Sequence, residues 1–101
     1  MSAPPLDPRA LGMVRAVFNR HPEVKTATLF GSRAKGAHTE RSDVDLAVTG
    51  GVAPIRAEAI AAELDELPLP YRFEVQPMEH IRCHPLIEHI RRVGIVIYPE
   101  A

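Results

Sequence analysis

Two aspartates that lie two positions apart, Asp43 and Asp45, are the residues of this chain best suited to chemistry. They lie in a segment whose alternating apolar residues predict a β-strand, and alternation places both carboxylates on the same face. Carboxylates that lie so close together repel each other unless a cation is bound between them. Mg²⁺ is the natural candidate because it binds carboxylate and phosphate oxygens together. The alternative is that both carboxylates are simply solvated on a half-exposed strand.

A Gly-Ser turn, Gly31-Ser32, follows the preceding apolar run and suits the binding of a phosphate group. Glycine lets the backbone approach a ligand closely, and the Ser32 hydroxyl can donate to it. A helix that begins at this turn favours an anion, and Arg33 and Lys35 supply positive charge nearby. Gly-Ser alone is also typical of an ordinary strand-to-helix turn. Together with the aspartate pair, it predicts a site for a metal-bound nucleoside triphosphate.

The turn does not fit the P-loop of Walker-type NTPases. Gly31 and Gly36 have the separation of the P-loop glycines, but Ala37-His38 follows where that motif requires Lys-Ser/Thr. A Walker-type NTPase is therefore disfavoured. His38 lies between the two motifs. A contact with a phosphate or substrate is one interpretation of this residue, and an ordinary loop residue is the favoured one.

Glu74 is our candidate for a third carboxylate, which is needed to hold two metal ions or to deprotonate a nucleophile. It lies in the alternating segment from Tyr71 to Gln76, on the polar face. An unpaired carboxylate in a central strand would be costly, which favours a functional role. The alternative is a surface glutamate paired with Arg72. Glu40 competes for the same role, but it lies in a polar stretch that favours solvation.

The elements that must position these residues follow from the apolar periodicity. Asp7-Pro8 is a favourable helix start, and that helix should end near His21-Pro22. The remaining pattern predicts strands at 24–30, 43–49, 71–76 and 95–98, a helical turn at 32–36, and helices at 53–67 and 85–93. We expect an α/β (α+β) fold with a single mixed sheet of about four strands flanked by helices. The domain should span residues 8–99 and follow a flexible N-terminal arm at 1–7.

Composition narrows the class of protein. The 101 residues suffice for one domain, and the net charge of −1 disfavours direct nucleic-acid binding. The single cysteine excludes an internal disulfide and fits a reducing compartment. Neither a signal peptide nor a membrane span is visible. We therefore expect a cytoplasmic protein that does not enter membranes.

The spacing of the two motifs matches a known signature. Gly31-Ser32, followed by Asp43 and Asp45, resembles the GS-x(10)-D-x-D signature of the DNA polymerase beta-like nucleotidyltransferase superfamily. The small size resembles its minimal nucleotidyltransferases (MNT). Residues 73–75 and 90–98 are similar to the C-terminal half of these proteins, so the likeness spans roughly residues 10–99. The resemblance implies the polymerase-beta-like nucleotidyltransferase fold.

The resemblance also implies roles for individual residues. Gly31 and Ser32 would hold the triphosphate of ATP or another NTP, and Asp43 and Asp45 would bind Mg²⁺. Glu74 would fill the third-carboxylate position, which is most often aspartate in the family, and two metal ions would then be possible. The implied reaction transfers a nucleoside monophosphate to a hydroxyl and releases pyrophosphate.

Small members of this family often form a complex with a helical HEPN-type protein. In some pairs the partner is a toxin, and the nucleotidyltransferase acts as its antitoxin by adding AMP to a tyrosine. The resemblance therefore implies an adenylyltransferase with a HEPN-like partner. The alternative is a catalytically weak or inactive nucleotide-binding subunit that acts by forming a complex with such a partner. Short strands with open sheet edges favour a homo- or hetero-oligomer.

One further group, His80, Cys83 and His84, has the residue types of a transition-metal site. No fourth ligand is evident, and Pro85 interrupts the spacing. We therefore expect partly exposed histidines and a buried or half-buried cysteine.

Overall fold

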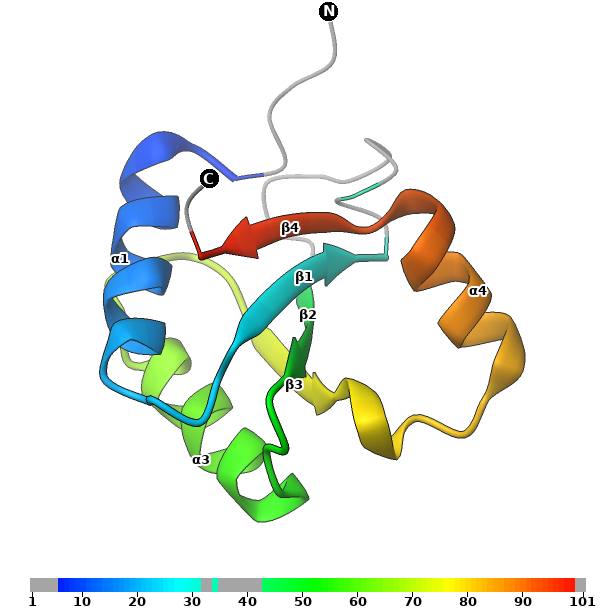
Figure 1. Ribbon diagram of the computed structural model, residues 1–101. Coiled ribbons are helices and arrows are strands. Elements are labelled where there is room, and N and C mark those ends of the chain that lie inside the picture. Colours follow the sequence, from blue (N-terminus) through cyan, green and yellow to red (C-terminus); the bar gives the residue numbers. More distant parts are fainter. Residues whose placement is uncertain (1–5, 32–33, 35–42, 100–101) are drawn as a thin grey trace, which may run out of the picture.

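The structure, a computed structural model, describes residues 6–31, 34 and 43–99. Their elements, in chain order, are α1 (Pro8–Asn19), β1 (Thr26–Phe30), β2 (Val44–Thr49), α3 (Pro54–Asp65), β3 (Phe73–Pro77), the 3-10 turn η1 (Met78–His80), α4 (His84–Val93) and β4 (Ile95–Tyr98) (Figure 1). None of the helices described is long and apolar enough to cross a membrane. The helical turn expected at 32–36 falls largely outside the described residues.

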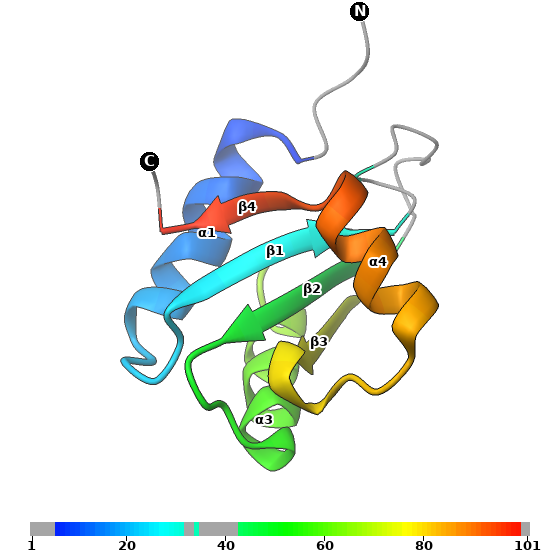
Figure 2. The ribbon, with the colours of Figure 1, turned by 45° about the vertical axis from the view of Figure 1, so that its right-hand side comes forward.

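The four strands described form one sheet in the order β3-β2-β1-β4. β1 pairs antiparallel with β2 and with β4, whereas β2 and β3 run parallel. Helices α1 and α3 cover one face of the sheet, and α4 lies against the other (Figure 2). The predicted mixed sheet of about four strands flanked by helices is therefore confirmed.

Helix α1 begins where the sequence predicts. The Asp7 carboxylate accepts a hydrogen bond of 2.8 Å from the backbone N–H of Ala10, and Pro8 occupies the first helical position. Leu6, which belongs to the expected arm at 1–7, is only 2% exposed and packs in the core. The first part of that arm, residues 1–5, lies outside the described residues.

The main core lies between the sheet and the helix pair α1 and α3. Its largest fully buried side chains come from those helices and from the two central strands, β1 and β2: Phe18, Leu29, Leu46, Ile60 and Leu64. Burial of such side chains is the dominant favourable contribution to folding. This core fixes the central strands, which carry the residues of interest at their ends.

Strand β2 is covered on both faces. Its even-numbered residues from 44 to 48 face the main core as predicted. Asp45 and Ala47 share the opposite face, but Ala47 is buried against Phe30 and against Ile90 of α4. The face of β2 that carries Asp45 is therefore partly covered by α4.

The placement of Glu74 differs from the prediction. Its strand, β3, lies at the edge of the described sheet and not at its centre. Its side chain is exposed, whereas the neighbouring Phe73 and Val75 are buried. The alternation in sequence identified the polar face correctly. It carries no information on strand order, so the argument from the cost of a buried carboxylate does not apply.

Both edge strands are held by side chains from the helices beside them. The backbone N–H of Phe73 in β3 donates to the Asp65 carboxylate at the end of α3, at 2.9 Å. In β4, the carbonyl oxygen of Ile97 accepts from Nε of Arg15 in α1, at 2.7 Å. These bonds connect each edge of the sheet to the same helical layer.

Candidate functional site

The strands β2 and β3 bring two of the predicted carboxylates side by side. Asp45 and Glu74 are partners in the parallel register of these strands, so both side chains leave the same face of the sheet. Asp43 immediately precedes β2, is exposed, and acts on Asp45 through its charge. The structure thus groups the three predicted carboxylates at one end of β2.

The pKa of Asp45 reflects its burial and the neighbouring carboxylates. Partial burial is the largest cause, followed by the charge of Glu74, a hydrogen bond with the Glu74 carboxyl, and the charge of Asp43. Together they raise the pKa of Asp45 from 3.8 to about 6. A cation bound between these groups would oppose all the charge effects, because it stabilises the ionised form of each carboxylate.

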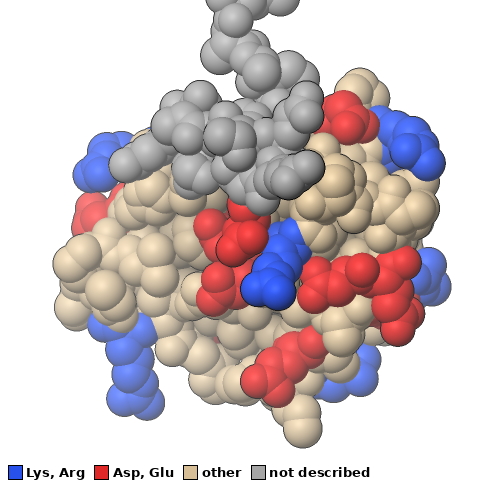
Figure 3. Space-filling view, turned by 180° about the vertical axis from the view of Figure 1, so that it is seen from behind, with Lys and Arg blue, Asp and Glu red and all other residues tan. Residues whose placement is uncertain are grey.

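The donor set fits Mg²⁺ with two protein carboxylates. Mg²⁺ usually takes one or two carboxylates and completes its shell with phosphate oxygens and water. Asp43 and Asp45 can supply that pair. Within the described residues no three His, Cys, Asp or Glu side chains form a ligand group for a metal ion, so a metal set that includes Glu74 stays a prediction. Figure 3 shows that acidic side chains gather around one basic side chain on the face opposite that of Figure 1.

Gly31 adjoins Asp45 for a reason that lies in the sheet register. Phe30, the last residue of β1, pairs with Asp45 across the antiparallel strands, and Gly31 follows it. A Cβ at Gly31 would lie 2.5 Å from Oδ2 of Asp45, so a side chain there would require the carboxylate to move. Gly31 also has a φ of 78°, in the left-handed region that favours glycine. Glycine at position 31 therefore leaves the Asp45 carboxylate its place beside the turn.

A histidine that the sequence analysis did not identify completes the described site. The backbone N–H of Gly31 donates to Nε2 of His89 in α4, at 3.0 Å. The His89 ring also meets the Phe30 ring edge-on, with centroids 6.2 Å apart. The sequence offers one indication of its position. His89 lies three residues after Leu86, so in a helix the two side chains share the side that faces the sheet.

Several predicted site residues lie outside the described part of the chain. These are the phosphate-binding candidates and the two loop residues weighed beside them: Ser32, Arg33, Lys35, His38 and Glu40. Their roles stay predictions. Among the described residues, the site consists of Gly31, three carboxylates and His89.

The group of His80, Cys83 and His84 does not form a metal site. His80 ends η1, Cys83 caps α4 and His84 begins it, and all three are exposed. No group of three such ligands occurs in the described ranges. The expected burial of Cys83 is wrong, because the residue lies at the helix start and faces solvent.

A pocket of about 280 Å³ lies on the α4 face of the sheet. Sheet residues Thr28, Ala47 and Thr49 line it together with Ile90 and Arg91 of α4. None of the carboxylates of the candidate site lines this pocket. The pocket and the carboxylates are therefore distinct features of the same face.

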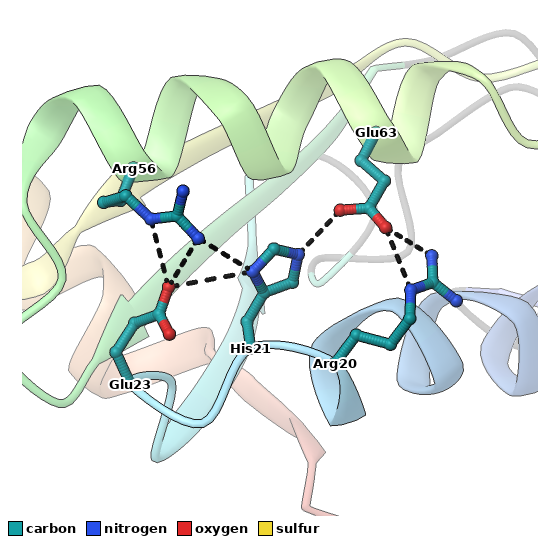
Figure 4. A network of polar contacts seen from close by, with 5 residues as sticks. All are labelled: Arg20, His21, Glu23, Arg56 and Glu63. Atoms are coloured by element: carbon teal, nitrogen blue, oxygen red, sulfur yellow. Dashed lines mark hydrogen bonds and ion pairs between the residues drawn. The ribbon is translucent and has the colours of Figure 1, made fainter.

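A second polar cluster lies at the opposite end of β1 (Figure 4). His21, in the connection from α1 to β1, lies between Glu63 of α3, at 2.6 Å, and Glu23, at 3.7 Å. Glu63 also pairs with Arg20, and Arg56 bonds Glu23 at 3.1 Å. The hydrogen bonds from Arg20 and His21 lower the pKa of Glu63. The cluster fastens α3 to the α1–β1 connection and is structural in character.

Solved structures with the same fold include several toxin-antitoxin complexes. One match is to the crystal structure of a toxin-antitoxin with AMP-PNP, at 18% identity and a TM-score of 0.72, covering 92% of this chain and 73% of the other. Another is to MntA-HepT, a toxin-antitoxin, at 15% identity and a TM-score of 0.70, covering 91% and 72%. A third is to a complex of tri-AMPylated Shewanella oneidensis HEPN toxin with MNT antitoxin, at 15% identity and 0.68, covering 89% and 70%. At such identities the likeness establishes the shared fold.

Sequence comparison identifies the family. Comparison with curated protein sequences finds no match. The family model described as polymerase beta nucleotidyltransferase matches residues 13–101, a range that contains both motifs and all three carboxylates. The resemblance seen in the Gly-Ser turn and the aspartate pair is thereby confirmed, and the chain belongs to the polymerase beta nucleotidyltransferase family.

Proposed function

We propose that this chain is a Mg²⁺-dependent adenylyltransferase that moves AMP from ATP to a hydroxyl group of a HEPN-type partner protein, and so acts as an antitoxin. The observation that carries the proposal is the contact between the Gly31 turn and Asp45, with Glu74 beside it. A turn suited to phosphate and carboxylates suited to Mg²⁺ thus meet at one point. The family and the toxin-antitoxin complexes that share the fold support the choice of reaction and partner.

The chemistry requires one bond to form and one to break. The acceptor oxygen attacks the α-phosphorus of ATP, the bond to the oxygen bridging the α- and β-phosphates breaks, and pyrophosphate leaves. Mg²⁺, when bound, neutralises the triphosphate and stabilises the charge that develops on its oxygens. Asp43 and Asp45 hold the metal in this proposal, and the turn at Gly31-Ser32 binds the phosphates.

Glu74 is the group best placed to receive the proton of the acceptor hydroxyl. It is exposed on an edge strand, where a residue of another protein can approach it. Its carboxylate lies next to Asp45 in register, so the accepted proton stays close to the reacting atoms. General-base roles of this kind contribute about 10²- to 10⁴-fold to rates.

A second candidate function is a nucleotide-binding subunit without transferase activity that acts by complex formation. It is favoured by one observation, the glutamate Glu74 at the third-carboxylate position, where aspartate is the more frequent residue in the family that the chain resembles. In that case MgATP would bind without transfer. The two candidates therefore differ in a single measurable step.

Incubation of the chain with a HEPN-type partner, Mg²⁺ and α-labelled ATP tests the proposal. We expect label on the partner, and its loss by at least about 100-fold in Asp45→Asn. Glu58→Gln is the matched control, because it removes an exposed carboxylate of α3 without touching the site. Label transfer that survives in Asp45→Asn contradicts the proposed site. Binding of ATP by the wild type without any transfer supports the second candidate.

A further inference from the structure

The backbone N–H of Gly31 already has a partner in the protein. It donates to Nε2 of His89 at 3.0 Å. In this bond Nε2 is the acceptor, so the hydrogen bond needs the tautomer whose Nε2 carries no hydrogen. The Gly31 amide therefore faces α4.

The position of His89 is defined by more than this bond. Its ring contacts Phe30 at 6.2 Å between centroids with the planes at 79°, an edge-to-face arrangement that is favourable for aromatic rings. The next residue, Ile90, is buried against Phe30 and Ala47. Helix α4 thus holds the imidazole against two consecutive residues at the end of β1.

The hydrogen bond to His89 acts on the peptide group between Phe30 and Gly31. β1 ends at Phe30, and the Gly31 N–H is the first donor beyond the strand. Fixing this N–H fixes the plane of the peptide that leads into Gly31. A Cβ on Gly31 would lie 2.5 Å from Oδ2 of Asp45, so Gly31 is directly beside this carboxylate. The orientation of that peptide therefore sets where the turn lies relative to the carboxylate.

We propose that His89 is a positioning residue for the nucleotide site: it holds the Gly31 peptide, through its Nε2, in the orientation that places the phosphate-binding turn against Asp45. The inference rests on the proposed function, because it assumes that the turn binds the triphosphate of ATP. Gly31 then leaves space for the Asp45 carboxylate. His89 retains its bond to Gly31 when MgATP is bound.

Two variants separate the hydrogen bond from the packing of the ring. His89→Phe keeps an aromatic ring against Phe30 and removes the acceptor. His89→Gln restores an acceptor at a similar distance from the backbone. Loss of one positioning hydrogen bond should weaken MgATP binding about tenfold in His89→Phe, and His89→Gln should recover most of the affinity. In the transfer assay the loss should fall mainly on KM for ATP, because His89 does not touch the reacting atoms.

The wild-type protein provides a test that needs no variant. In ¹⁵N-labelled protein, NMR should show a scalar coupling across the hydrogen bond between the Gly31 nitrogen and Nε2 of His89, both with and without MgATP. The absence of this coupling overturns the inference even if His89→Phe fails to fold. Equal MgATP affinity of folded His89→Phe and wild type overturns it as well, because the contact is then packing alone.

The outcomes also separate this inference from the proposed function. MgATP binding that depends on His89, without transfer to any partner, overturns the transferase proposal and supports the positioning role. Transfer activity that is unaffected by either substitution overturns the positioning role alone. A wild type that binds no MgATP overturns both.

Discussion

Gly31 and Asp45 lie so close together that a Cβ at position 31 would come within 2.5 Å of the Asp45 carboxylate, which would then have to move. The two residues come from neighbouring strands whose register brings Phe30 opposite Asp45. Gly31 and the Asp45 carboxylate are therefore neighbours in space, and a side chain added at position 31 should displace the carboxylate.

The first prediction concerns Gly31→Ala. The positive φ of residue 31 costs roughly 1–2 kcal/mol for a residue with a Cβ, and displacement of Asp45 adds to it. Gly51→Ala is the matched control, because Gly51 has nearly the same φ, 77°, and no atom lies within 4 Å of the point that its new methyl group would occupy. Urea denaturation should show a larger loss of stability in Gly31→Ala, and MgATP binding should fall in that variant only. Equal losses of stability and of MgATP affinity in Gly31→Ala and Gly51→Ala would contradict the contact between residue 31 and Asp45.

The second prediction concerns the pH dependence of the metal-free protein. The pKa of Asp45 is raised to about 6, so its protonated form is favoured by folding. This contribution to stability is complete below the unfolded value of 3.8 and is lost as the pH rises through about 6. The shift corresponds to roughly 3 kcal/mol, which screening of a half-exposed group reduces to roughly 1 kcal/mol.

Urea denaturation between roughly pH 4 and pH 7 measures this loss. Asp45→Asn should flatten the dependence over that range, whereas the wild type should regain stability on addition of Mg²⁺ at the upper end. A wild-type and an Asp45→Asn curve with the same slope would show that Asp45 titrates normally.

The third prediction concerns the coupling of Glu74 to Asp45. Glu74→Gln removes the charge and the carboxyl partner that raise the pKa of Asp45, so that pKa should fall while burial keeps it above 3.8. Carbon-detected NMR titration of the Asp45 carboxyl measures the change. Label transfer should fall in Glu74→Gln and persist in Glu74→Asp, which keeps the carboxylate. An unchanged Asp45 titration would show that the two groups do not interact.

The fourth prediction concerns the polar cluster at the other end of β1. His21→Ala removes the contacts of the imidazole with Glu63 and Glu23 and should cost roughly 1–2 kcal/mol of stability. MgATP affinity should stay at the wild-type value, since the cluster lies away from Gly31. His80→Ala, at an exposed position, should leave both quantities unchanged. A drop in MgATP affinity in His21→Ala would place the cluster within the nucleotide site.

Local chemistry explains why much of this fold could be predicted from sequence. Asp7-Pro8 predicts the start of α1 because a carboxylate cap and a proline at the first turn act within four residues. Helix α4 ends at Val93 as predicted, and the N–H of the following Gly94 donates to the Ile90 carbonyl. The spacing of the Gly-Ser turn and the aspartate pair predicts the meeting of Gly31 and Asp45, because β1 and β2 are adjacent antiparallel strands.

The features that the sequence did not reveal depend on contacts between distant segments. Alternation in 71–76 is the same for a central and for an edge strand, so the exposure of Glu74 required the order of the sheet. His89 lies 58 residues beyond Gly31, and no local pattern relates them. The burial of Ala47 depends on the position of α4 over its face of the sheet, which is a tertiary property.

The bond between Phe73 and Asp65 determines how this protein can associate with others. Alternate residues of a strand present their N–H groups to the same edge, so Phe73, Val75 and Pro77 share the outer edge of β3. The Phe73 N–H is taken by Asp65, and proline has none, which leaves Val75 as the single donor of these three. An incoming strand would find only one backbone donor among these three residues. A partner that approaches Glu74 should therefore be recognised mainly through side chains, and strand-to-strand growth at β3 is disfavoured.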